Sequence, residues 1–157
     1  MDINKPIFSD SGVVNVLIGK NVKIVLPVNM YGCKIGDNCF IGPFVEIQKN
    51  VFIGNNTKIQ SHSFICEMVT IGENCFIGHG VMFINDNFSD GMPAGRDKKK
   101  WKVTTIGNNV CIGSNATILP VSICDNVVIG AGAVVTKEIN ISGKYAGNPA
   151  ILLKIKL

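Results

Sequence analysis

Branched aliphatic residues recur at every sixth position along most of the chain. One unbroken series comprises Ile35, Ile41, Ile47, Ile53, Ile59, Ile65, Ile71, Ile77 and Phe83. The next position in each hexad is often glycine, and the fifth is small or β-branched, as at Cys39, Val45, Val51, Thr57, Ser63, Val69, Cys75 and Val81. The apolar stripe of an α-helix recurs at 3.6 residues, so a period of six predicts short strands joined by regular turns.

The same phase extends toward both ends of the chain. It reads Ile18, Ile24 and Met30 before the series, and Ile106, Ile112, Ile118, Ile123, Ile129 and Val135 after it. Two steps are one residue short, because 35 − 30 = 5 and 123 − 118 = 5. We expect a tight turn to absorb each deletion.

Three hexads, or 3 × 6 = 18 residues, suffice to close one triangular coil. Stacked coils would pair their strands in parallel, fill the interior with the aliphatic column and use glycine at the corners. The pattern therefore predicts an all-β parallel β-helix that forms a single domain over residues 1–157. Spacing alone does not define the hand of the coil.

Composition narrows the class of protein. Of the 157 residues, 46% are hydrophobic and 17% charged, yet no apolar run is long enough for a membrane-spanning helix. The N-terminal "MDINKPIFSD" does not read as a secretory signal, so we expect a cytoplasmic protein with no membrane partner. The net charge of +4 is mild and does not imply nucleic acid, although an anionic small ligand is compatible with it.

The six cysteines form neither a CxxC motif nor a Cys/His cluster with zinc-ligand spacing. They are Cys33, Cys39, Cys66, Cys75, Cys111 and Cys124. We expect reduced, small core residues and no metal site.

The repeat stops once, between Phe83 and Ile106, where the interval is 106 − 83 = 23 residues instead of six. This predicts a long loop over about residues 84–105, and loops of this length in compact domains are usually functional or disordered. It holds "NDNFSD", Arg96, the basic run 98–100 and the single tryptophan, Trp101, but no histidine. We expect it to project toward a neighbouring subunit.

Three C-terminal segments resemble the hexapeptide-repeat acyltransferases. They are "IGNNVCIGSNATILP" at 106–120, "VIGAGAVVTKEI" at 128–139 and "YAGNPAILLKI" at 145–155, and with the repeat the resemblance covers nearly the whole chain. It implies a left-handed β-helix, a homotrimer with active sites between subunits, and acetyl-CoA as the acyl donor without a metal.

The loop indicates the acceptor. In similar sugar O-acetyltransferases this loop bears a histidine that acts as general base, and a hydroxyl is a poor nucleophile without one. A neutral amine attacks a thioester unaided once it is positioned and the oxyanion is stabilised. The loop resembles that of N-acetyltransferases for nucleotide-linked 3-amino sugars. The predicted substrate is a dTDP- or UDP-linked 3-amino-deoxysugar for bacterial surface glycan (O-antigen or lipopolysaccharide), held by coils and loop because the chain has no separate nucleotide-binding domain.

In this resemblance Asn85 matches the asparagine that orients the amine, although Asn is also common at the start of a loop. Asp86 and Asn87 are neighbours that could assist. His79 is either a base that reaches the acceptor or a polar corner residue. His62 is a candidate sugar contact at the subunit seam.

For the acyl donor, the residue matching Ser114 offers its backbone N–H to the thioester carbonyl in similar enzymes. Ala131, Thr136 and Lys137 match positions that contact the pantetheine arm and phosphates of CoA, and Lys154 could pair with a phosphate. Packing between coils is an equally good reason for Ala131 and Thr136, and Lys137 and Lys154 are equally well interpreted as solvated surface lysines.

Arg96, Trp101 and the lysine run have two interpretations. They contact the nucleotide by charge and stacking, or they belong to a solvated loop without a ligand.

Two other functions stay open. An O-acetyltransferase for a sugar or serine would need His79, and a non-catalytic trimeric scaffold would bind neither substrate. A γ-type carbonic anhydrase shares the fold but needs three zinc histidines, and the chain has two.

Overall fold

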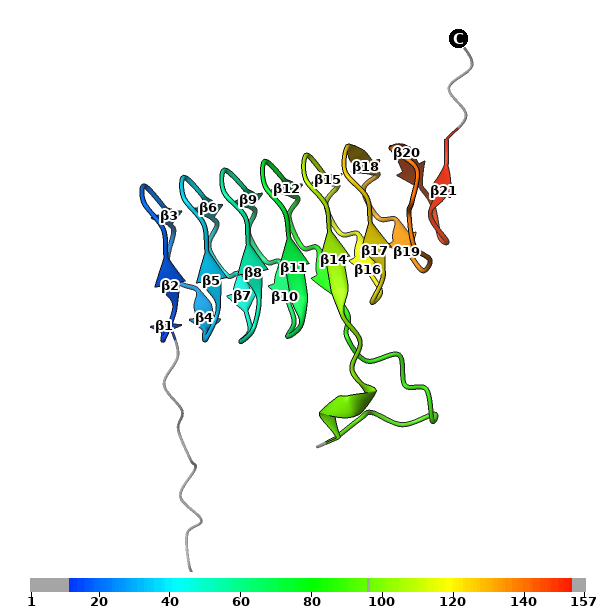
Figure 1. Cartoon of the computed structure of the whole chain (residues 1–157), viewed down its shortest axis with the longest axis horizontal. Coiled ribbons are helices and arrows are strands. Elements are labelled where there is room, and N and C mark those ends of the chain that lie inside the picture. The colour runs from blue at the N-terminus through cyan, green and yellow to red at the C-terminus, as the bar shows by residue number, and fades with distance from the viewer. Residues whose placement is uncertain (1–11, 96, 154–157) are drawn as a thin grey trace, which may run out of the picture.

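The chain is a stack of triangular coils in which each coil contributes one short strand to each of three sheets (Figure 1). The structure, a computed structural model, describes residues 12–95 and 97–153. Sheet A consists of β1 (Val13–Val14), β4 (Asn29–Tyr31), β7 (Glu46–Ile47), β10 (Phe64–Ile65), β13 (Met82–Phe83), β16 (Thr117–Ile118) and β19 (Val134–Val135).

Sheet B consists of β2 (Leu17–Ile18), β5 (Lys34–Ile35), β8 (Phe52–Ile53), β11 (Val69–Ile71), β14 (Thr104–Ile106) and β17 (Ser122–Ile123). Sheet C consists of β3 (Lys23–Ile24), β6 (Phe40–Ile41), β9 (Lys58–Ile59), β12 (Phe76–Ile77), β15 (Cys111–Ile112), β18 (Val127–Ile129), β20 (Gly143–Ala146) and β21 (Ile151–Leu152). Within the described residues every strand pair is parallel except the terminal hairpin β20–β21. The predicted parallel β-helix is confirmed.

Strand register confirms a coil of three hexads. Ile47 lies opposite Ile65, and Ile53 lies opposite Ile71, so equivalent residues are 18 apart. From Met30 to Val135 the aliphatic series is buried and forms one continuous core cluster. Burial of these side chains is the main favourable contribution to folding, because the strands themselves are only two to four residues long.

The rows of corners form three edges, which we call A/B, B/C and C/A after the sheets that they join. Both five-residue steps fall at the A/B edge, between β4 and β5 and between β16 and β17. The long loop leaves the stack at the same edge, between β13 and β14 (Figure 1). The expectation that turns absorb the deletions is therefore confirmed, and one edge takes up every change of phase in the series.

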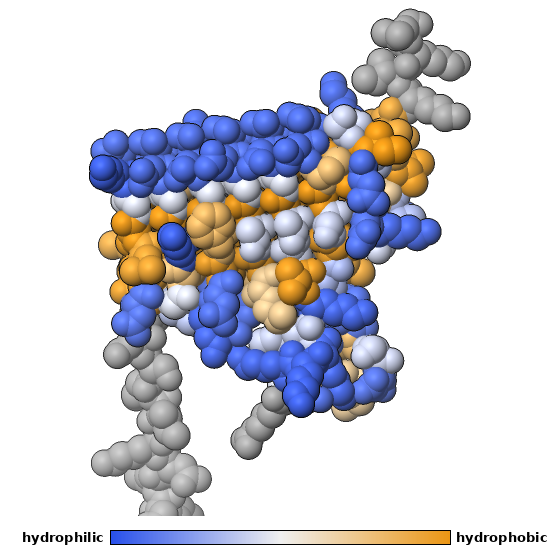
Figure 2. Space-filling view, viewed as in Figure 1, coloured by the Kyte–Doolittle hydropathy of each residue, from blue (hydrophilic) through white to orange (hydrophobic). Residues whose placement is uncertain are grey.

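The B/C edge is a continuous polar ladder, visible as the hydrophilic band along the upper edge in Figure 2. Asn21 donates to Asn38, and Asn38 donates to Asn56, each at 3.2 Å between side-chain atoms. One asparagine in each corner of this row adopts left-handed backbone angles, as at Asn38 with φ 57°. That conformation costs most residues about 1–2 kcal/mol, and Asn tolerates it through local hydrogen bonds.

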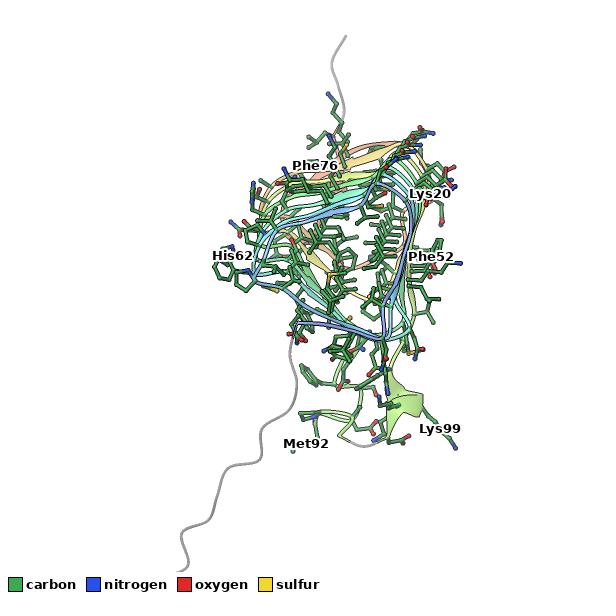
Figure 3. All side chains as sticks on the ribbon, turned by 90° about the vertical axis from the view of Figure 1, so that its left-hand side faces the viewer. Lys20, Phe52, His62, Phe76, Met92 and Lys99 are labelled. Atoms are coloured by element: carbon green, nitrogen blue, oxygen red, sulfur yellow. The ribbon has the colours of Figure 1, made fainter. Side chains whose placement is uncertain are left out.

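The coil is left-handed. Seen from the N-terminal end in Figure 3, the chain runs from Phe52 on the right, over sheet C at the top, to His62 on the left while it recedes from the viewer. This agrees with the hand that the family resemblance implies. No helix in the described part of the chain is long and apolar enough to cross a membrane, and the short 3₁₀ helix η1 (Lys98–Lys100) lies in the loop.

The cysteine prediction needs one correction. All six are free, and Cys33, Cys39, Cys66 and Cys75 are buried. Cys111 is exposed, because it lies between the inward-facing Val110 and Ile112 and therefore points outward from sheet C. Burial raises the pKa of the Cys33 thiol to about 11 and that of Cys66 to about 12, which makes both poor nucleophiles at neutral pH.

Two buried threonines provide a test of the core. The Thr57 hydroxyl donates to Gly72 O and accepts from Cys75 N, whereas the Thr104 hydroxyl is buried without a hydrogen-bond partner in the described residues. Thr104→Val should raise the free energy of unfolding by about 1 kcal/mol, and Thr57→Val should lower it by about 1–3 kcal/mol. Denaturant titration followed by circular dichroism, at one protein concentration, measures both. Equal effects of the two substitutions would contradict this account of the core.

Candidate functional site

The residues predicted to form the site divide between the two edges of sheet A. The C/A edge carries His62, His79, Ser114 and Ala131, and the A/B edge carries Asn85, Asp86, Asn87, Trp101, Thr136 and Lys137. His79 precedes β13 and Asn85 follows it, so a whole strand crossing, on the order of 15–20 Å, separates the two groups. Figure 3 shows the separation, with His62 at the left edge and the loop below the stack. One chain therefore brings the predicted catalytic residues His79 and Ser114 together but holds Asn85 apart from them.

Hydrogen bonds between successive coils order the C/A edge. Ser61 Oγ lies 2.9 Å from His79 Nδ1, and the backbone N–H of His79 donates to Ser114 Oγ at 3.2 Å. The His79 side chain is exposed, and the Ser61 hydroxyl, which can donate or accept, holds the imidazole through its Nδ1 atom. The edge thus holds an oriented imidazole beside the Ser114 corner.

The backbone N–H of Ser114 is available for a ligand. At the B/C edge, corner amides donate to the next coil, as when Asn108 N–H donates to Asp125 Oδ1 at 2.7 Å. At the C/A edge the coil after Ser114 presents Ala131, which has no side-chain acceptor. No described residue accepts from the N–H of Ser114 or of Ala131. An unpaired amide in a water-accessible corner is suited to bind a carbonyl oxygen or an oxyanion.

Glycine at position 78 keeps this amide accessible. A Cβ on Gly78 would stand 2.6 Å from Ser114 N, closer than real side chains approach a backbone nitrogen. The hexad glycine here is required by close approach of two coils at the Ser114 corner.

Asn85 closes the base of the loop. Its side-chain Nδ2 donates to the backbone oxygen of Glu67 at 3.2 Å, and its backbone carbonyl oxygen accepts from Lys102 N at 2.9 Å. The turn interpretation of Asn85 thus has a structural basis, while no described residue donates to its Oδ1. That oxygen is the atom that an amine could contact.

Asp86 organises the loop through both of its carboxylate oxygens. Its two carboxylate oxygens accept from Phe88 N at 2.9 Å and from Ala94 N at 2.6 Å. Asn87, its neighbour, is exposed.

An ion pair fastens the loop to the coils. Lys98 Nζ contacts both carboxylate oxygens of Glu67, at 2.9 and 3.2 Å, and lies 4.7 Å from the ring centre of Trp101. The Glu67 side chain is only 11% exposed, and its hydrogen bond raises the pKa of Lys98. Lys100 pairs with Asp90 at the surface. Two of the three lysines in the basic run are therefore engaged within the chain, and Trp101 packs under one of them.

The remaining predicted ligand contacts are at the C-terminal coils. Ala131, Thr136 and Lys137 are exposed, the first at the C/A edge and the other two at the A/B edge. Arg96 and Lys154 lie outside the described residues. Within the described ranges no three His, Cys, Asp or Glu side chains are grouped to hold a metal ion.

Sequence reasoning missed two residues of the site. Ser61 could have been found from the repeat, because it precedes His79 by one coil (79 − 61 = 18 residues) and therefore lies directly beside it. Glu67 had no such signal, since its partner Lys98 comes from the inserted loop, whose path the repeat does not define.

Comparison with known proteins identifies the repeat. The "Bacterial transferase hexapeptide (six repeats)" family matches residues 32–67 and 50–85, and the "Hexapeptide repeat of succinyl-transferase" matches residues 103–137. Together the matches cover more than half of the chain. The bifunctional protein GlmU of Streptococcus uberis is 33% identical over 135 residues, which are 81% of this chain and 29% of GlmU. The chain spans less than a third of the length of the curated relatives it matches.

Solved structures share the fold. A variant of AntD, an N-acyltransferase from Bacillus cereus in complex with dTDP and coenzyme A, superposes with a TM-score of 0.72 at 21% identity, over 89% of this chain and 83% of AntD. PerB from Caulobacter crescentus, in complex with CoA and GDP-perosamine, superposes with a TM-score of 0.62 at 17% identity, over 92% of this chain and 58% of PerB.

The loop attachment makes a testable prediction. Glu67→Gln removes the charge that holds Lys98, so trypsin should cleave the loop after Lys98 to Lys100 several-fold faster than in the wild type, because cleavage follows local opening. The matched control is Asp90→Asn, which breaks an exposed ion pair and should change the rate little. Mass spectrometry of the fragments gives both rates. Identical rates in all three proteins would show that the Glu67 contact does not hold the loop.

Proposed function

Because the chain belongs to the bacterial hexapeptide-repeat transferase family, we propose that it is an acetyl-CoA-dependent N-acetyltransferase. The proposed acceptor is the amino group of a dTDP- or UDP-linked 3-amino-deoxysugar, in the cytoplasm of a bacterium that builds a surface glycan. The observation that carries the proposal is the backbone amide of Ser114, which is unpaired among the described residues at the C/A edge. The loop lies at the other edge of sheet A and contains no histidine.

The reaction is direct attack within a ternary complex. The neutral amine nitrogen forms a bond to the thioester carbonyl carbon, and the carbonyl oxygen becomes an oxyanion that accepts from the Ser114 N–H. Collapse breaks the carbon–sulfur bond, the amine loses its proton, and CoA leaves as a thiol. The products are the N-acetylated sugar and CoA. Burial raises the pKa values of Cys33 and Cys66, which makes these two thiols poor nucleophiles for an acyl-enzyme route.

The division of the site between two edges favours assembly from two subunits. Asn85 Oδ1 at the A/B edge of one chain can meet the Ser114 amide only when a neighbour presents its C/A edge to the loop. The exposed Thr136 and Lys137 on one edge, and Ala131 on the other, extend the same seam toward the C-terminal coils, where CoA would lie. A cyclic homotrimer with three such seams joins the edges head to tail and closes.

The similar proteins support the substrate class. AntD is an N-acyltransferase whose structure contains dTDP and coenzyme A, and the structure of PerB contains CoA and GDP-perosamine. Both have the coil stack of this chain, and the resemblance of the loop favours the 3-amino sugar over other amines.

One observation favours a second candidate, transfer to a hydroxyl. His79 is exposed and held by Ser61 beside the Ser114 corner, in the position that a general base would need. The two candidates differ in their dependence on this ring, since an amine acceptor does not require His79 as a base.

The acceptor is tested by mass spectrometry of protein incubated with acetyl-CoA and nucleotide-linked 3-amino, 4-amino and hydroxyl-only sugars. We expect acetylation of the 3-amino sugar, with kcat lowered about 10- to 100-fold in Asn85→Ala through loss of one hydrogen bond to the reacting amine. The control is Asn140→Ala, at an exposed asparagine that lies at neither the C/A edge nor the A/B edge. Acetylation of hydroxyl sugars alone, abolished in His79→Ala, would replace the proposal with the second candidate.

Shared sites are tested by mixing defective subunits. Ala131→Asp should give the Ser114 N–H an internal acceptor, as Asp125 does for Asn108, and lower kcat by about 100- to 1,000-fold. Co-expressed with Asn85→Ala in equal amounts, it should restore about a quarter of wild-type activity, because each mixed trimer regains one intact site. If each chain held a complete site, the mixture would be as inactive as the separate variants.

A further inference from the structure

Two aromatic side chains occupy strained corners at the N-terminal half of the C/A edge. Phe44 and His62 have φ angles of 60° and 63°, in the left-handed region where the other corners of the coils mostly use Asn or Gly. Their rings stack with centroids 4.8 Å apart and an interplanar angle of 30°. Phe44 is 57% exposed, so its ring gains little from burial. A bulky residue that is both strained and exposed is a sign of function, because neither packing within the chain nor backbone preference explains it.

A hollow adjoins the Phe44 ring on sheet A. It has a volume of about 310 Å³ and is lined by Pro27, Val28, Asn29, Phe44, Val45 and Glu46. Asn29 and Glu46 are opposed on neighbouring strands, which places an amide and a carboxylate side by side in the hollow. Gln48 Nε2 donates to Glu46 Oε1 at 3.0 Å and so orients that carboxylate. An aromatic face beside a few polar groups suits a flat heterocycle that carries hydrogen-bonding atoms on its rim.

The distance from this platform to the Ser114 corner matches an extended ligand. Successive corners of the C/A edge pass from Phe44 to His62, Gly80 and Asn115, so three coil spacings of about 4.8 Å, or about 14 Å, separate Phe44 from the Ser114 corner. A nucleotide-linked sugar places its base at one end and its hexose at the other, with a ribose and two phosphates between them. Laid along the edge, such a molecule would bring its sugar to the acyl-transfer corner while its base reaches Phe44.

We propose that the Phe44 ring, backed by His62, is a stacking platform for the nucleobase of the acceptor, and that Asn29 and Glu46 contact the rim of the base. This inference rests on the proposed function and assigns the nucleotide end of its substrate. His62 thereby acts by stacking on Phe44 from the side away from the hollow, rather than as a contact to the sugar.

The decisive variant is Phe44→Asn. Asparagine tolerates the left-handed corner, so the melting temperature should stay unchanged or rise by a few degrees. The affinity for free dTDP, UDP or GDP, whichever the wild type binds in isothermal titration calorimetry, should fall about 5- to 150-fold, the loss expected for one base–aromatic stack. Affinity for CoA should not change. Phe44→Trp should restore nucleotide binding, and Phe52→Ala, at an exposed phenylalanine of sheet B, should leave it as in the wild type.

Several outcomes would overturn the platform. The first is equal nucleotide affinity in the wild type and in Phe44→Asn. The second is a wild type that acetylates amino sugars but binds no nucleotide. The third is a lower oligomeric mass of Phe44→Asn in light scattering, which would make the ring a subunit contact. The proposed reaction fails separately. If nucleotide binds and Phe44→Asn loses it while no amine is acetylated, the platform stands and the N-acetyltransferase does not.

Discussion

Every feature of this molecule depends on the stacking of buried aliphatic side chains from one coil onto those of the next. Strands of two to four residues cannot hold a sheet on their own, but the register that sets Ile47 against Ile65 repeats around the stack and produces one uninterrupted core. Because each coil must close after three hexads, corners align in rows, and residues far apart in sequence become neighbours along an edge. The chemistry of the protein is therefore organised by edges rather than by a pocket within one chain.

The three edges share a backbone geometry and differ in what their corner side chains do. At the B/C edge, Asn and Asp side chains accept from the corner amides of Lys20, Asp37, Glu73 and Asn108 in the preceding coil. At the C/A edge the His79 N–H donates to Ser114 Oγ, and the Ser114 N–H is unpaired among the described residues because Ala131 of the next coil has no side-chain acceptor. The side chain at the equivalent corner of the next coil thus decides whether a corner amide is paired within the chain.

The A/B edge accommodates irregularity, and this explains why the loop is there. Both shortened coils and the insertion fall at this edge, whereas the B/C ladder tolerates neither without losing its hydrogen bonds. The buried carboxylate of Glu67 then restrains the loop through Lys98, and Asn85 ties its base to the coil below. The loop is consequently a defined surface at the A/B edge of sheet A, and it does not fold over the Ser114 corner of its own chain.

The sequence alone determined the β-helix, its coil of three hexads, the buried columns and the position of the loop, because a strict period leaves one way to bury every sixth side chain. It also offered Asn85, His79 and Ser114 as candidate site residues, and their roles stay predictions. Tertiary structure decided what these residues can do together. The outward position of Cys111, the Glu67–Lys98 pair, the unpaired Ser114 amide and the separation of Asn85 from Ser114 all depend on which corner faces which coil. A repeat specifies the spacing of the corners, but hydrogen bonds across coils and the path of an insertion are set only when the stack is formed.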